Sequence, residues 1–324
     1  MKVLITLVLV LLLNRLLAFE RAYLDLINTF PSRESKIADD YLVYPYDLAI
    51  YNNTLYIADA SDNCIKVFSI DGKFLNKIGK KGSGPGELLS PFVITVNKKL
   101  KEIYCWDSGN HRISVYGLDG SFRRIIKTSL SIWDLDCSNN YLYASAFNEK
   151  TKKLFLKYDM QGKILTAFGD LFDDRVKKPR ARKFLYGQVQ VVCWSDSVYA
   201  FFERLPLIQV FSNDGRLVRS IELDLASVRE EVTDYFKGKR KRLPSVWLWG
   251  AFIEQGRFFC YIRDKRVLVQ FNGIGKATYK YFLSRSISDE TAHFLRFVGK
   301  IRDSFIFIDR DEAQIKIFRT AASP

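Results

Sequence analysis

The chain has 324 residues, of which 15% are aromatic, and a formal net charge of +14. Its two histidines are too few for a metal site built from several imidazoles, and its five cysteines include no C-x-x-C pair of the zinc-binding kind. Neither a G-x-S-x-G element nor a Walker loop occurs, so the motifs of common hydrolases and nucleotide-binding proteins are absent.

Residues 1–18 have the composition of a cleavable signal peptide. Lys2 provides a positive n-region, residues 3–13 form an apolar run of eleven residues, and Ala18 ends a short exit region. Spanning a bilayer takes about 20 apolar residues, and Arg15 interrupts the apolar stretch here. An uncleaved membrane anchor is the alternative. We therefore expect an exported protein, periplasmic or extracellular, with a mature chain of residues 19–324.

Residues 55–74 and 103–122 are two copies of one repeat, identical at seven of twenty positions with an offset of 48. In each copy an apolar run ends in aspartate, Asp59 or Asp107, and a polar loop and a second β-rich run follow. An Asp-Gly pair then predicts a tight turn into a third run, with its glycine at Gly72 or Gly120. A further strand upstream makes four antiparallel strands per unit, and this period is typical of a β-propeller blade.

The second copy resembles the NHL-repeat family of β-propellers. The matching residues are the stretch 107–113 (DSGNHRI) and the glycine-rich connector 82–87 with Pro91 beyond it. The resemblance implies that Asp107 and Arg112 form a tether inside the blade. The first copy has Cys64 where the second has Arg112, so the first blade needs another arrangement. The whole chain is also similar to secreted six-bladed propeller proteins of bacteria.

The remainder of the chain repeats this pattern in outline and gives six units. They span residues 45–79, 91–126, 131–168, 186–223, 246–283 and 294–319. The last unit ends before its fourth strand, while residues 22–30 form a β-rich run without a unit of their own. Pairing of that run with the last unit would close the ring and leave no exposed strand edge. We therefore predict an all-β, six-bladed propeller, closed by an N-terminal strand, that forms one domain and a monomer.

Two connectors between units are long, residues 169–185 and 224–245. In the second, Leu225, Val228 and Val232 fall at helical spacing, and acidic residues precede basic ones, as suits a helix dipole. This pattern predicts a short helix between the fourth and fifth units that packs on the propeller.

The same two connectors carry two basic runs. The first consists of Arg175, Lys177, Lys178, Arg180, Arg182 and Lys183, and the second of Lys237, Lys239, Arg240, Lys241 and Arg242. Connectors between four-stranded blades emerge on the same face as the loops between second and third strands. Those loops hold further basic residues, namely Arg204, Arg263, Lys265 and Arg266. One face is therefore predicted to be basic and to attract anions, although charged loops can also serve solubility alone.

The cysteines and two aspartates leave smaller alternatives open. Most cysteines lie in or at the ends of predicted strands, which is typical of buried single thiols, with one disulfide as the alternative. Asp134 and Asp136 on an inner strand could contribute to a calcium site in the channel, or act as capping or solvated carboxylates. No cofactor is otherwise predicted.

The predicted function is that of an exported, non-enzymatic binding scaffold. Its basic face would hold an acidic polymer or an extracytoplasmic protein, and an anionic membrane surface also remains open. Some NHL propellers bind RNA, but export argues against nucleic acid here. The alternative from another class is a metal-dependent lyase or hydrolase with a calcium-type site in the central channel.

Overall fold

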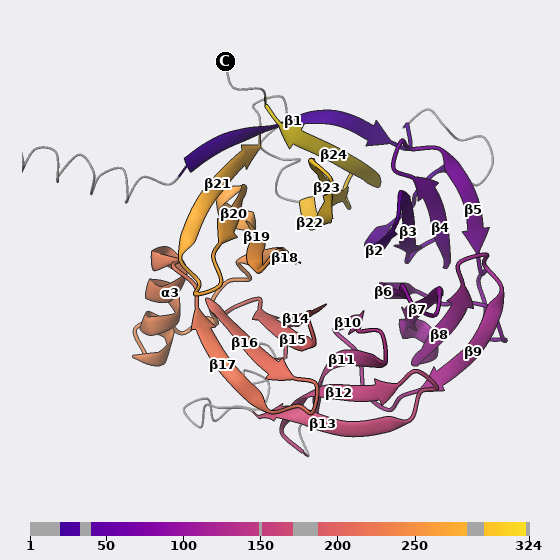
Figure 1. The fold of residues 1–324 in the computed structure, drawn as a ribbon, viewed down its shortest axis with the longest axis horizontal. Coiled ribbons are helices and arrows are strands. Elements are labelled where there is room, and N and C mark those ends of the chain that lie inside the picture. Colours follow the sequence, from indigo (N-terminus) through magenta and orange to yellow (C-terminus); the bar gives the residue numbers. More distant parts are fainter. Residues whose placement is uncertain (1–19, 33–39, 149–150, 171–186, 284–294, 322–324) are drawn as a thin grey trace, which may run out of the picture.

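The computed structural model describes residues 20–32, 40–148, 151–170, 187–283 and 295–321. Within these ranges 24 strands form five hydrogen-bonded sheets. The sheets stand around a central channel, with the first strand of each unit nearest the centre (Figure 1). No helix in the described ranges has the length and apolar composition needed to cross a membrane. The predicted signal peptide, residues 1–18, lies outside those ranges.

Four of the sheets have four strands each, and every neighbouring pair within them is antiparallel. The first contains β2 (Pro45–Tyr51), β3 (Thr54–Asp59), β4 (Cys64–Ser69) and β5 (Phe74–Ile78). The second contains β6 (Pro91–Asn97), β7 (Glu102–Asp107), β8 (Arg112–Gly117) and β9 (Phe122–Lys127). The third contains β10 (Asp134–Cys137), β11 (Tyr141–Asn148), β12 (Lys153–Asp159) and β13 (Ile164–Asp170). The fourth contains β14 (Val189–Trp194), β15 (Ser197–Phe202), β16 (Leu207–Ser212) and β17 (Leu217–Glu222).

The fifth sheet has eight strands, in the order β18-β19-β20-β21-β1-β24-β23-β22. One half contains β18 (Leu248–Glu254), β19 (Arg257–Ile262), β20 (Val267–Phe271) and β21 (Ala277–Leu283). The other half contains β22 (Leu295–Ile301), β23 (Ser304–Asp309), β24 (Gln314–Thr320) and β1 (Glu20–Phe30). The sequence predicts six separate four-stranded sheets, whereas hydrogen bonding joins the last seven strands and β1 into one sheet.

The N-terminal strand β1 is the element that joins these two halves. Its second part runs antiparallel to β24, from Leu24 opposite Thr320 to Phe30 opposite Ile315, so the predicted pairing of residues 22–30 with the last unit is confirmed. Its first part runs parallel to β21, from Glu20 opposite Tyr279 to Leu24 opposite Leu283. With 11 residues, β1 is long enough to bond to one outer strand and then to the next.

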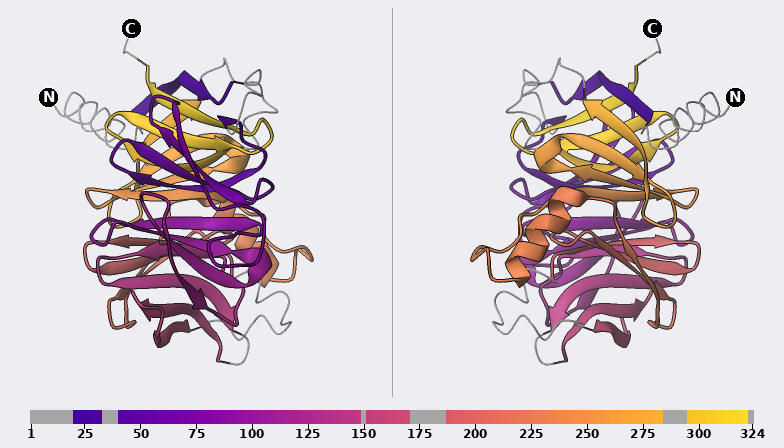
Figure 2. Two further views of the ribbon diagram at one scale, coloured as in Figure 1. Left: turned by 90° about the vertical axis from the view of Figure 1, so that its right-hand side faces the viewer. Right: turned by 90° about the vertical axis from the view of Figure 1, so that its left-hand side faces the viewer.

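All units run in the same direction, which gives the channel two different ends. At one end, which we call the connector end, each inner strand begins, each second strand ends, and the chain passes from one sheet to the next. At the hairpin end lie the loops from first to second strands and the turns from third to fourth strands. Figure 2 views the ring edge-on, and α3 (Ala226–Phe236) lies at its side, on the connector between the fourth and fifth units.

The hydrophobic core lies between neighbouring sheets. One cluster joins Tyr56 and Val67 of the first sheet to Ile94 and Tyr116 of the second. Another joins the fourth and fifth sheets and includes Val228 of α3. The helix predicted in the second long connector is therefore confirmed, and its apolar side packs on the propeller.

The repeated Asp-Gly turns need glycine at both positions. Gly72 has a φ of 89° and Gly120 a φ of 88°, in the left-handed region that side chains disfavour. A Cβ atom at Gly72 would lie 2.8 Å from the ring of Phe30 in β1. The turn glycine of the first unit therefore also allows the close approach of the closing strand.

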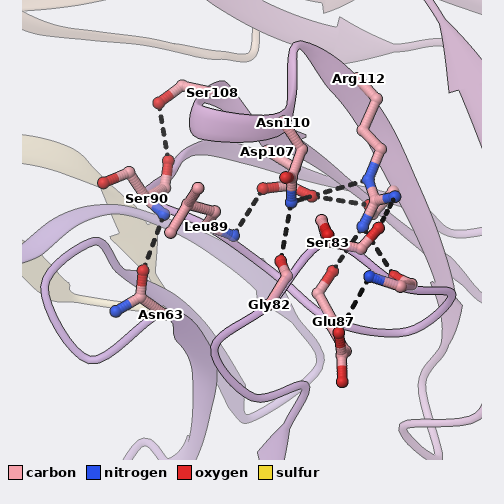
Figure 3. Close-up of polar contacts among 12 residues, drawn as sticks. Asn63, Gly82, Ser83, Glu87, Leu89, Ser90, Asp107, Ser108, Asn110 and Arg112 are labelled. Atoms are coloured by element: carbon pink, nitrogen blue, oxygen red, sulfur yellow. Dashed lines mark hydrogen bonds and ion pairs between the residues drawn. The ribbon is translucent and has the colours of Figure 1, made fainter.

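Asp107 and Arg112 form the tether that the NHL resemblance implies (Figure 3). Arg112 Nε donates to Asp107 Oδ2 at 2.8 Å, and both side chains are buried. The remaining guanidinium nitrogens donate to the carbonyl oxygens of Ser83, Gly84 and Glu87 at 2.8 to 2.9 Å. One arginine thus fixes the glycine-rich connector to the blade.

The first and last units use lysine in place of this arginine. Lys66 is fully buried, and its Nζ lies 2.7 Å from Asp62 in the loop of the first unit. Asp59 meanwhile accepts the backbone N–H groups of Val43 and Tyr44 at 2.7 and 2.8 Å. In the last unit Lys316 pairs with the buried Asp309.

All five cysteines are free thiols. Three are buried and two are half-buried, and burial raises the pKa of every one of them. The prediction of unpaired cysteines is therefore confirmed, and burial is confirmed for three of the five.

Candidate ligand site at the channel mouth

Three aspartates in the channel hold neighbouring inner strands together. Asp47 Oδ2 accepts the N–H of Ile94 at 3.1 Å, across from β2 to β6. Asp134 and Asp136 in β10 accept the N–H groups of Val191 and Cys193 in β14, at 2.7 and 2.8 Å. Each bond satisfies a channel-facing N–H that the open inner edge of a blade would otherwise leave unpaired.

Asp134 and Asp136 were also the candidates for a calcium site. Besides Cys193, Asp136 Oδ1 accepts the Thr95 hydroxyl and the N–H of Cys137, both at 2.8 Å. Burial raises the pKa of both carboxyls, and the charge of Asp47 adds to the shift at Asp134. No group of three or more metal-ligating side chains occurs in the described part of the chain. Both carboxyl groups therefore link neighbouring inner strands.

At the connector end of the channel lies a pocket of about 250 Å³, which we call the mouth pocket. Its walls come from the starts of inner strands and from the loops after second strands. The lining side chains are Tyr46, Trp133, Asp134, Gln188, Gln190, Glu203, Val246, Trp249, Arg263, Arg296 and Arg310. Three aromatic residues and three arginines are among them.

Two of its arginines stack on aromatic rings. The guanidinium of Arg310 lies 3.9 Å from the ring centre of Tyr46, and that of Arg263 lies 4.1 Å from the ring centre of Trp249. Such stacking attracts the cation to the ring face and holds the guanidinium plane in place. The N–H groups at the guanidinium edge are then preorganised for an acceptor.

Arg310 is incompletely paired. Its Nη2 donates to the carbonyl oxygen of Tyr46 at 2.8 Å, but its buried Nε has no hydrogen-bond partner among the described residues. Burial and the neighbouring charge of Arg296 lower the pKa of Arg310. Two cations held close together at a pocket favour a bound anion.

Arg296 forms the floor of the pocket. Its Nη1 lies 3.3 Å from Asp47 Oδ1 and donates to the carbonyl oxygen of Tyr46 at 3.1 Å. Arg296 also lines a second cavity of about 600 Å³ toward the hairpin end. The guanidinium therefore lies between the two cavities of the channel.

On the opposite wall, Glu203 orients an exposed tryptophan. Glu203 Oε1 accepts the indole N–H of Trp133 and an amide N–H of Gln190, both at 3.1 Å. Burial raises the pKa of Glu203. Trp133 is 39% exposed, so its ring is both fixed and accessible.

Comparisons with known proteins identify a family and a fold. A family described as Domain of unknown function (DUF4934) matches residues 39–308. The chain belongs to the DUF4934 family. No curated protein matches this member of the family.

Solved structures similar to this DUF4934 protein include one that is named a β-propeller domain. A Bacteroides fragilis protein assigned as exported is 14% identical, with a TM-score of 0.61 over 94% of this chain and 99% of that one. Virginiamycin B lyase from Staphylococcus aureus is 10% identical, with a TM-score of 0.56 over 87% and 81%. The β-propeller domain of Myceliophteria thermophila Cps50 is 9% identical, with a TM-score of 0.55 over 92% and 100%. At such identities the likeness supports the propeller fold alone.

The basic runs predicted from the sequence only partly enter this site. The first run, including Lys177, Lys178, Arg180, Arg182 and Lys183, lies outside the described residues. In the second, Arg240 pairs with Glu231 at 2.7 Å and Lys239 lies 3.8 Å from Asp234, whereas Lys241 and Arg242 are exposed. This connector continues to Val246 at the mouth pocket.

Most of the mouth pocket was not foreseen from the sequence. Arg263 belonged to the predicted basic face, but Arg296, Arg310, Trp133 and Glu203 did not. A signal exists in the repeat itself: Glu203, Arg263 and Arg310 each directly follow the second strand of a unit. Charged residues that recur at one position of a propeller repeat gather around the channel.

Proposed function

We propose that this DUF4934 protein is an exported, six-bladed propeller of the NHL type that binds an anionic partner at the connector end of its channel. The partner would be an acidic polymer or an acidic extracytoplasmic protein. The observation that carries this proposal is the convergence of Arg263, Arg296 and Arg310 with aromatic rings in the mouth pocket.

The count of six blades treats the eight-stranded sheet as two units. Its halves, β18–β21 and β22–β24 with β1, each have four antiparallel strands, and the backbone ladder that joins them is the parallel pairing of β1 with β21. Neighbouring sheets share their cores all around the ring, which supports a single domain over residues 19–324. The signal-peptide composition of residues 1–18 supports export.

Heparin, a sulfated polyanion, is a suitable first probe for the whole face. We expect replacement of Lys177, Lys178, Arg180 and Arg182 by serine to weaken binding, and likewise replacement of Lys239, Arg240, Lys241 and Arg242. Both variants should also flatten the salt dependence, because its steepness reports the number of cations engaged. The measurement is heparin affinity at several salt concentrations.

The control removes the same charge from the hairpin end. Lys98, Lys99, Lys101 and Lys163 are exposed in loops or turns there, and their replacement by serine should leave heparin binding nearly unchanged. An equal loss of affinity in this control would mean that net charge alone matters, and would contradict the proposal. Melting temperatures should be similar in all variants, since exposed charges contribute little to stability.

The enzymatic alternative rests on the fold. Virginiamycin B lyase has a similar propeller, and a calcium-type site here would have to use Asp134 and Asp136. Their carboxylate oxygens already accept protein N–H and O–H groups, which argues against that role. Metal content of protein purified without added metal tests this directly, and stoichiometric calcium would favour the lyase or hydrolase.

A further inference from the structure

The mouth pocket is suited to a small, ring-shaped ligand group. Its volume of about 250 Å³ is below the roughly 300–1,000 Å³ of pockets for drug-sized ligands. Its lining residues lie at the connector end of the channel, so the proposed ligand group is one unit of a longer chain that extends from that end. The pocket is therefore suited to a single unit of a polymer, whereas a flat surface would be suited to a stretch of several units.

The charges in the pocket favour a singly charged anion. Three guanidinium groups line it, but the carboxyl groups of Asp134 and Glu203 lie in the same walls. Arg310 has a buried Nε that finds no partner in the described part of the chain, and stacking fixes the planes of Arg310 and Arg263. Guanidinium edges bind carboxylates by parallel hydrogen bonds, whereas a doubly charged phosphate would meet stronger repulsion from the two acidic side chains.

The remaining walls suit a ring that carries hydroxyl groups. Trp133 presents an accessible indole whose orientation is fixed by Glu203, and the C–H face of a sugar ring packs on such a surface. Gln188 accepts from Arg204 through Oε1, and Gln190 donates to Glu203 through Nε2. The other amide atom of each glutamine has no protein partner among the described residues, which leaves a donor and an acceptor for hydroxyl groups.

We propose that the mouth pocket binds a uronic acid unit of an acidic polysaccharide, with its carboxylate on Arg310 and Arg263 and its ring on Trp133. This inference rests on the proposed function and narrows the anionic partner to carboxylated sugars. Arg296 sets the depth of the pocket beneath the carboxylate.

Trigalacturonic acid is the probe, and its methyl ester is the matched neutral ligand. Isothermal titration should give binding of the acid and at least tenfold weaker binding of the ester, because esterification removes the charge that the arginines recognise. Equal binding of acid and ester would overturn the inference. Equally tight binding of polyglutamate, a carboxylated chain without sugar rings, would overturn the assignment to sugars.

Two arginine variants test the carboxylate contact. Arg310→Ala should weaken trigalacturonate binding about tenfold or more, by loss of charge-assisted hydrogen bonds. Because Arg310 also bonds to the backbone of Tyr46, Arg263→Gln is the second variant, and we expect a similar loss from it without a change in melting temperature. The matched control is Arg216→Ala in the turn between β16 and β17, where the arginine side chain is 84% exposed. Unchanged affinity in both pocket variants would contradict the proposal.

Two tryptophan variants test the ring contact. Trp133→Ala should weaken trigalacturonate binding about tenfold, within the range for loss of an aromatic contact at a binding hot spot. Trp194→Ala in the larger cavity at the hairpin end should not. An equal effect of the two variants would place the ligand elsewhere in the channel and overturn the assignment.

The heparin and trigalacturonate experiments separate this inference from the proposed function. If heparin binding depends on the connector lysines but trigalacturonate does not bind, the inference fails and the anion-binding function stands. If neither ligand binds, the proposed function fails as well. If heparin fragments displace trigalacturonate from the mouth pocket and bind there more tightly, the preferred group is a sulfate and the inference is wrong.

Discussion

At the scale of single residues, a buried cation ties the loop of a blade to its strands. Arg112 bonds both to Asp107 and to three carbonyl oxygens of the preceding connector. In the first and last units a lysine two positions further along, Lys66 or Lys316, supplies the cation instead. The same strand face can thus carry the charge at either position, because side chains two residues apart lie on the same side of a strand.

We expect Arg112→Ala to lower the free energy of unfolding by about 3–5 kcal/mol, because it leaves a buried carboxylate without its cationic partner. The matched control is Arg216→Ala, which breaks an exposed pair with Asp214 and should cost less than about 1 kcal/mol. Denaturant unfolding of both variants gives the comparison. Similar values for the two would mean that the Asp107–Arg112 pair does not stabilise the blade.

At the scale of elements, β1 determines how the ring closes. It pairs with β24 and with β21, and it buries Leu24 and Phe30. Phe30 also contacts Phe68 of β4 with ring centres 5.6 Å apart, so the closing strand reaches the first sheet. One strand therefore connects the first unit with the last two.

Leu24→Ala should destabilise the protein by about 2–5 kcal/mol, as expected for a cavity at a fully buried leucine. Ile27 in the same strand is 47% exposed, and Ile27→Ala should change the free energy of unfolding by less than about 1 kcal/mol. Deletion of residues 19–30 should cost more than Leu24→Ala, since it also removes the ladder to two strands. A melting temperature unaffected by this deletion would refute closure by β1.

At the scale of the whole molecule, each sheet shares its core with its neighbours. The cluster between the fourth and fifth sheets extends to α3, and another links the first sheet to β23 and β24. The first and last units meet through this hydrophobic cluster and through the polar contacts of Arg296 and Arg310 with Asp47 and Tyr46. Such an arrangement favours folding as one cooperative unit.

We therefore expect a single unfolding transition, with coincident midpoints by far-UV circular dichroism and by tryptophan fluorescence. Trp106 in β7 and Trp247 in the connector before β18 are both buried and lie in different parts of the ring, which fluorescence therefore samples separately. The measurement is denaturant unfolding followed by both signals. Two separated transitions would indicate independently folding parts and would contradict a single domain.

The sequence by itself determined the features that depend on near neighbours along the chain. Alternating apolar residues, the aspartate at the end of the second strand and the glycine of the following turn each act within a few positions. They therefore identify the strands and the helix after β17 without reference to other units. The Asp107–Arg112 pair was implied by the resemblance to NHL repeats. The unpaired run at residues 22–30 also indicated its partner, because only one unit lacked a strand.

Only the tertiary structure decided which residues meet across the channel. Trp133, Arg263 and Arg310 come from three different units, and their distance depends on the curvature and closure of the ring. The fusion of two units through β1 likewise depends on where its two partner strands lie in space. Contacts of this kind join residues far apart in the chain, and no local pattern encodes the separation of their side chains.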